Sequence, residues 1–142
     1  MISISKNRFH ALVTAAWMNR AMIALVYVWF GSLKIFGVSP AEGLVTKLFE
    51  ITLAPYMSIQ AFLVLLGVVE CIIGLLWLVP KITKWAFRVM MGHLFTTFLP
   101  VLFLPDETWE SFLTLTLTGQ YIIKNVVLLS AAWFIYVFRP EE

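Results

Sequence analysis

The chain has 142 residues, of which 61% are hydrophobic and only 13% are charged, and its formal net charge is +2. Soluble domains carry about 25% charged residues, and a chain this short could not hide so many apolar side chains inside a water-exposed globule. The composition therefore argues against a soluble protein. It also argues against a nucleic-acid partner, because the basic residues form no run or stripe that could follow a phosphate backbone.

Four apolar segments are long enough to cross a hydrocarbon core about 30 Å thick. In chain order they are residues 18–37, 57–79, 86–104 and 118–138. Glycines and prolines, which stop helices, mark the breaks between them. Residues 1–142 show no internal repeat and no sign of a second domain. We therefore predict a single all-α domain, a bundle of four transmembrane helices. The first segment is too long for a signal-peptide core and predicts an anchor that stays in the membrane.

The distribution of basic residues predicts the orientation of these spans. Lys and Arg near the ends of spans are retained on the cytoplasmic side. Seven of them fall on one side, namely Lys6, Arg8, Arg20, Lys81, Lys84, Arg88 and Arg139, whereas the other side has only Lys47. We therefore expect both termini inside the cell (N-in, C-in), and Asp106, Glu107 and Glu110 outside it.

The first outer connection, residues 38–56, contains a short amphipathic pattern. Its apolar positions are Ala41, Leu44, Val45, Leu48 and Phe49, which share one face of a helix. We expect a short helix that lies at the outer interface or packs back on the bundle. A helical linker without a function of its own is the more ordinary interpretation.

Three ionisable residues fall inside the predicted spans, where a charge is costly unless it is paired or hydrated. They are Lys34, Glu70 and Lys124. Residues three, four and seven apart share one side of a helix. Lys34 therefore shares a face with Tyr27 and with small residues that let another helix approach. Glu70 shares its face with Gly67 and Gly74, so both side chains are expected to point into the bundle.

Spans three and four add further polar side chains. In span four, Gln120 and Lys124 share a face and Asn125 is adjacent, while in span three His93 lies on the polar side. With these residues, all four helices are predicted to contribute polar atoms to one interior.

The helical rise of about 1.5 Å per residue predicts the depth of these groups. Lys34 and Lys124 would lie about 5 to 10 Å below the outer surface, with Glu70 and His93 together near mid-membrane. Whether Glu70 pairs with Lys34, Lys124 or His93 stays open at this stage. Two lysines near one acid would leave room for an anionic or strongly polar ligand. The alternative is that Lys34 reaches to the outer interface and Glu70 only locks the helices together.

Other reactive residues offer weaker candidates. His93 has no second membrane histidine with which to hold a b-type haem, since His10 lies outside the spans. Cys71 is the only cysteine, which excludes an intrachain disulfide, and we interpret it as a packing residue. No metal site, nucleotide-binding loop or dinucleotide fingerprint is predicted.

Three segments, 26–37, 67–76 and 119–125, resemble the DoxX-like superfamily of four-helix membrane proteins. The likeness is closest to the branch that contains the reactive chlorine resistance membrane protein, although the connection after span one is shorter here. The resemblance rests on a G-x-x-K pattern at Gly31 and Lys34, an E-x-x-x-G pattern at Glu70 and Gly74, and the late Lys124. It implies that Lys34, Glu70 and Lys124 form the polar signature, and that the chain is a multi-pass protein of the bacterial inner membrane.

Some relatives in the superfamily resemble the membrane subunit of thiosulfate:quinone oxidoreductase, and others are linked to oxidative-stress defence. The first hypothesis is therefore a redox-linked protein, an enzyme or a subunit of one, that binds a quinone or a small oxidised sulfur species. No electron-carrying cofactor is encoded by a motif, so a quinone is the one cofactor that this hypothesis invokes. The predicted site residues are Glu70 and His93 for proton transfer, and Lys34, Lys124, Gln120, Tyr27 and Asn125 for ligand binding.

Two other classes of function stay open. The chain could be a non-enzymatic carrier or lipid-binding protein, for which dimerisation would help because four helices without an inverted repeat make a poor transporter. It could also be a structural subunit of a membrane complex. In every case the partners expected are the lipid bilayer and either a second copy or another membrane subunit.

Overall fold

The computed structural model describes residues 6–139, and 79% of these residues are helical. In chain order the elements are α1 (Lys6–Ile35), α2 (Glu42–Glu50), α3 (Ile59–Trp77), the 3-10 helix η1 (Pro80–Ile82), α4 (Thr83–Phe103), α5 (Pro105–Thr108), β1 (Trp109–Ser111), β2 (Thr114–Leu115), α6 (Leu117–Ile123) and α7 (Asn125–Val137). Four helical stretches are long and apolar enough to cross a membrane: α1, α3, η1 with α4, and α6 with α7. The four predicted spans are thus confirmed as helices, although α1 begins at Lys6 rather than at residue 18.

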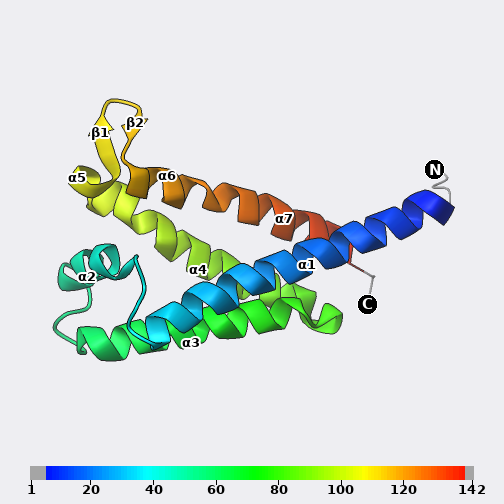
Figure 1. Ribbon diagram of the computed structural model, residues 1–142, viewed down its shortest axis with the longest axis horizontal. Coiled ribbons are helices and arrows are strands. Elements are labelled where there is room, and N and C mark those ends of the chain that lie inside the picture. The colour runs from blue at the N-terminus through cyan, green and yellow to red at the C-terminus, as the bar shows by residue number, and fades with distance from the viewer. Residues whose placement is uncertain (1–5, 140–142) are drawn as a thin grey trace.

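The long helices run alternately in opposite directions, so that the start of α1 and the end of α7 lie at one end of the bundle (Figure 1). We call this the termini end, and the opposite end, which carries α2 and the β1–β2 hairpin, the hairpin end. Helices α1 and α3 lie side by side, and the pair diverges from α4 and α6 toward the hairpin end (Figure 1).

The short helix predicted between the first two spans is present as α2, and it packs back on the bundle. It contacts both α3 and α4. Phe49 is buried, with its ring centroid 5.2 Å from that of Phe62 on α3. An exposed ion pair between Lys47 and Glu107 joins α2 to α5. Helix α2 therefore connects the two diverging pairs of helices.

Glycines set the close approach of α1 and α3. A Cβ atom on Gly31 would lie 2.5 Å from the carbonyl oxygen of Gly67, and one on Gly67 would lie 2.6 Å from the carbonyl oxygen of Gly31. Even a methyl group has no room there, so the two backbones are in direct contact. Small residues at helix interfaces allow this kind of approach in membranes. The contact fixes the register in which Lys34 of α1 meets Glu70 of α3.

Arg20 closes the termini end of the α1–α3 pair. The side chain is buried, and Nη1 donates to the Trp77 carbonyl at 2.9 Å while Nη2 donates to Thr83 Oγ1 at 2.6 Å. The last carbonyls of a helix lack partners within it, and a cation is favourable at that end of the helix dipole. Arg20 is predicted from the sequence as a basic flanking residue, and the structure gives it this further role.

The fourth span differs from one regular helix. It is interrupted at Lys124, between α6 and α7, where the amide of Val127 bonds the Lys124 carbonyl three residues back. Before it comes the hairpin of β1 and β2, which the sequence analysis did not predict. Its strands are antiparallel and pair Trp109 with Leu115, with an irregularity at Glu110.

Candidate functional site

Lys34 and Glu70 meet because of the directions of their helices. Side chains on a helix lean toward its N-terminus. Lys34, in the last turn of α1, therefore leans into the bundle, whereas Glu70 on the antiparallel α3 leans toward Lys34. Lys34 Nζ donates to Glu70 Oε1 at 2.9 Å and to Oε2 at 2.7 Å. Both side chains are less than 10% exposed, so the interpretation that Lys34 reaches to the outer surface is wrong.

His93 of α4 extends this pair. Its Nε2 atom lies 3.2 Å from Glu70 Oε1, and its Nδ1 atom lies 3.2 Å from the hydroxyl oxygen of Tyr27. The imidazole is held edge-on to the Tyr27 ring, with 5.3 Å between ring centroids. Three helices thus bring together four side chains, Lys34, Glu70, His93 and Tyr27, which we call the buried polar chain.

One atom of the buried polar chain lacks a hydrogen bond. His93 Nε2 is close to Glu70 Oε1, but the angle at Nε2 does not suit a hydrogen bond to that oxygen. Among the described residues, Nε2 is the one buried side-chain nitrogen or oxygen without a hydrogen-bond partner. If the Tyr27 hydroxyl donates to Nδ1, then Nε2 carries the ring proton. The hydrogen bond to Tyr27 thus assigns the ring proton to Nε2. It leaves Nε2 with a proton to offer to another acceptor.

The chemistry of the buried polar chain follows from these contacts. The Lys34 ammonium neutralises the Glu70 carboxylate, and an ion pair is the usual way in which charges persist inside a membrane. Tyr27 and His93 can exchange a proton through their hydrogen bond, and Lys34 and Glu70 can do so across the ion pair. A further anion would have to displace Glu70 from Lys34. The site therefore suits a neutral acceptor group better than an anion.

The structure does not bring Lys124 or Gln120 to this site. Both are exposed. Lys124 Nζ lies 4.8 Å from the centroid of the Tyr121 ring, and Gln120 Nε2 lies 3.4 Å from the Leu115 carbonyl. The prediction that Lys124 and Gln120 face the interior is therefore wrong. The buried positions of this span are Gly119, Ile122, Ala132 and Ile135, which put the opposite side of the helix inward.

The remaining predicted residues fall into two groups, those that meet at the site and one that does not. Tyr27, Glu70, His93 and Lys34 meet in the buried polar chain, and of the three partners left open for Glu70, Lys34 pairs with it and His93 contacts it. Asn125 is half-buried and, within residues 6–139, makes no side-chain hydrogen bond. It lies outside the chain of contacts.

Cys71 follows Glu70 on α3 but packs against α1. Its Sγ atom lies 3.6 Å from the Val28 carbonyl and 3.9 Å from Ser32 Oγ, in line with the packing role expected of it. No group of three or more His, Cys, Asp or Glu side chains able to hold a metal ion occurs among the described residues.

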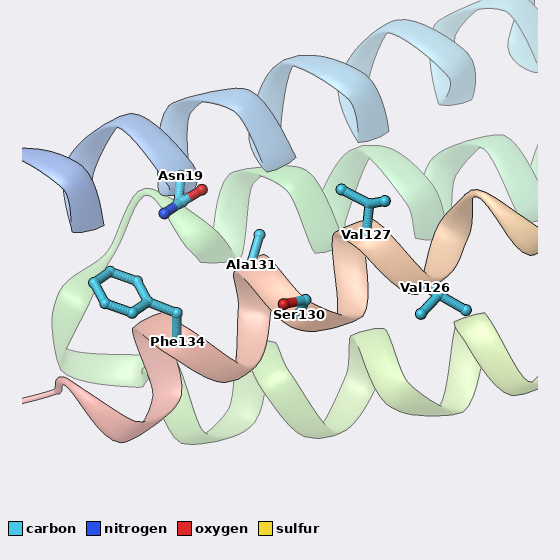
Figure 2. A pocket seen from close by; sticks show the side chains of 6 residues that line it. All are labelled: Asn19, Val126, Val127, Ser130, Ala131 and Phe134. Atoms are coloured by element: carbon cyan, nitrogen blue, oxygen red, sulfur yellow. The ribbon is translucent and has the colours of Figure 1, made fainter.

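A shallow open groove lies between α1 and α7, separate from the buried polar chain (Figure 2). Asn19 of α1 and residues of α7 line it. The α7 residues are Val126, Val127, Ser130, Ala131 and Phe134. Its walls are mostly apolar and contain none of the predicted site residues, so the groove is not part of the candidate site.

Comparison with known proteins adds no family to this description. No family model, no curated protein and no solved structure matches the chain.

Proposed function

We propose that this chain is a redox-linked, DoxX-like membrane protein that binds the polar head of a quinone beside the buried polar chain. The observation that supports this most is His93 Nε2, which is buried and has no hydrogen-bond partner among residues 6–139, while Nδ1 of the same ring is bonded to Tyr27. A hydrogen-bond donor in an apolar interior is costly to leave without a partner. A quinone carbonyl is an acceptor that fits it.

Each residue of the chain then has a defined part. A bound quinone supplies a centre that takes up electrons and protons. His93 donates from Nε2 to the carbonyl oxygen, and the Tyr27 hydroxyl, which is hydrogen-bonded to Nδ1, can replace the ring proton. The Glu70 carboxylate carries no proton of its own and can accept one. Lys34 keeps the carboxylate neutralised within the bundle. No motif for an electron carrier is present in the sequence, so the electrons come from a reduced substrate or from a partner subunit.

The same contacts argue against the anionic sulfur species as the ligand. That idea required Lys34 and Lys124 to face one cavity with positive charge to spare. Lys34 is instead held by both oxygens of Glu70, and Lys124 is exposed. The quinone alternative needs neither lysine to be free.

We place the protein in the bacterial inner membrane with its termini end in the cytoplasm. Arg8, Lys81, Arg88 and Arg139 lie in or beside the elements at that end, as the retention of basic residues on the cytoplasmic side predicts. A reduced substrate or another membrane subunit would deliver the electrons, because this sequence encodes no motif for an electron carrier.

Quinone binding can be tested without knowing the electron donor. Purified protein in lipid nanodiscs is titrated with a short-chain ubiquinone, and tryptophan fluorescence quenching reports the dissociation constant. We expect His93→Ala to weaken binding about tenfold, the loss of one hydrogen bond. Lys124→Met, which removes an exposed lysine, serves as the matched control and should bind like the parent chain. Equal affinity in His93→Ala and the parent would refute the proposal.

A structural role is the second candidate, because Lys34 and Glu70 neutralise each other completely. Replacing both members of a buried ion pair by apolar residues of similar volume often leaves stability unchanged. The double variant Lys34→Met/Glu70→Met should therefore fold. We expect it to lose quinone turnover, measured with the reductant that drives the parent chain. Full turnover in the folded double variant would favour the structural role.

A further inference from the structure

The hairpin at the hairpin end presents two large apolar side chains at its tip. Phe112 is 91% exposed and Leu113 is 77% exposed, between β1 and β2. Leu113 has φ = 59°, in the left-handed region that is costly for any residue other than glycine. Two-residue hairpin turns of this kind usually use Asn or Gly. The turn geometry does not require Phe112 and Leu113 here, and apolar side chains this exposed indicate that the tip meets something apolar.

The base of the hairpin is fixed to the ends of the long helices. The Thr116 amide donates to the Thr108 carbonyl at 3.0 Å, and Thr116 Oγ1 donates to the Glu107 carbonyl at 2.7 Å. Thr108 is completely buried. Gly119 of α6 packs so closely on the Thr108 carbonyl that a Cβ atom there would clash. The hairpin therefore starts at the level where α4 ends and α6 begins.

From this base the hairpin projects sideways, away from the long axis of the bundle (Figure 1). The long helices are those able to cross a membrane, so the hairpin extends roughly along the membrane plane rather than out into water. Trp109 lies at its base, where Nε1 donates to the Val101 carbonyl at 3.1 Å. Tryptophan is enriched at this depth, at the interface between headgroups and hydrocarbon.

The tip continues the apolar surface of the adjacent helix ends. Leu102 and Phe103 at the end of α4, and Leu117 at the start of α6, are all more than half exposed. On helices that cross a bilayer, such side chains face lipid. The hairpin lies beside these helix ends and extends to the side of the bundle (Figure 1).

We propose that the hairpin is a lateral membrane anchor, with Phe112 and Leu113 inserted between the lipids of the leaflet at the hairpin end. The partner is the lipid surface itself, because the tip continues a lipid-facing surface and carries no charge of its own. Apolar side chains with a flanking aromatic residue are the usual composition of interfacial anchors. The inference requires that the long helices cross a bilayer, and it does not depend on quinone binding.

Nitroxide labelling tests the depth of the tip. Because Cys71 is the only cysteine, Cys71→Ala gives a background in which a single new cysteine carries the label. Leu113→Cys is compared with Leu102→Cys as the lipid-facing reference and with Glu50→Cys, exposed on α2, as the reference for water. Protein is reconstituted in phosphatidylcholine vesicles. Collisions of the label with oxygen, which concentrates in lipid, and with a water-soluble nickel chelate are measured by power saturation.

We expect the oxygen-to-nickel collision ratio at Leu113 to shift away from the Glu50 value and toward the Leu102 value. A ratio equal to that at Glu50 would overturn the proposal, since the tip would then be in water. Protection from both reagents would also overturn it, because it would mean that protein covers the tip. Phe112→Cys gives a second label at the same tip and should show the same shift, in case the Leu113 variant fails to fold.

Discussion

Removing one member of the Lys34–Glu70 pair should destabilise the protein far more than removing both. Both side chains are less than 10% exposed and are joined by two contacts of 2.9 and 2.7 Å. Breaking a buried pair typically costs about 3 kcal/mol or more. Glu70→Gln leaves the Lys34 ammonium buried with no acid beside it, so we expect a loss of about 3 kcal/mol.

The loss in Lys34→Met should be smaller. The Glu70 carboxylate that remains still has a polar neighbour, His93 Nε2, at 3.2 Å. The double variant Lys34→Met/Glu70→Met should lie within about 1 kcal/mol of the parent chain, since no charge is left unpaired. The order of stability is therefore parent and double variant first, then Lys34→Met, then Glu70→Gln.

The free energy of unfolding can be measured by steric trapping in bicelles, which keeps the protein in lipid throughout. Helical content of each variant is checked by circular dichroism before unfolding. Single variants as stable as the parent would refute this reasoning, because the pair would then contribute nothing. A double variant whose loss of stability equals the sum of the two single losses would refute it as well, since no energetic coupling between the two charges would be left.

Three further perturbations test the packing of the bundle. Gly67→Ala should cost about 2 kcal/mol in unfolding free energy, because its Cβ would press on the facing α1 backbone. Gly92→Ala is the control: a Cβ there meets nothing within 4 Å, so this variant should be neutral or stabilised by about 0.5 kcal/mol. Arg20→Met should cost about 2 kcal/mol, since the Trp77 carbonyl loses its donor, and unchanged thermal unfolding would contradict that role. Leu113→Gly should raise stability in detergent by about 1 kcal/mol by relieving the backbone at φ = 59°, and a loss of stability there would contradict the strain.

Much of the fold was predictable because hydrophobicity and small residues constrain helices strongly. The spans matched the helices to within a few residues at most ends, since a long apolar run flanked by prolines has few alternatives. Helix α1 starts earlier than its apolar core, because a helix can continue past the hydrocarbon region. The hairpin was not predicted, because β1 and β2 are very short and the turn between them contains no glycine or asparagine.

The site was predictable in spans one to three and not in span four. The glycines beside Lys34 and Glu70 marked the faces that pack closely, and both faces point inward as expected. The same signal was present in span four at Gly119, which packs against Thr108, but the polar residues Gln120 and Lys124 were used there instead. An exposed lysine next to a tyrosine ring is stable without any buried partner, so its presence in a span did not fix its direction.

Infrared difference spectroscopy of a bound quinone with 13C-labelled carbonyls tests the central claim most directly. If His93 Nε2 donates to a carbonyl, the stretching band of that carbonyl is lowered relative to the free quinone. We predict that the lowered band is present in the parent chain and in Lys124→Met, and that it is lost in His93→Ala. A bound quinone whose carbonyl band is the same in the parent chain and in His93→Ala would contradict the account.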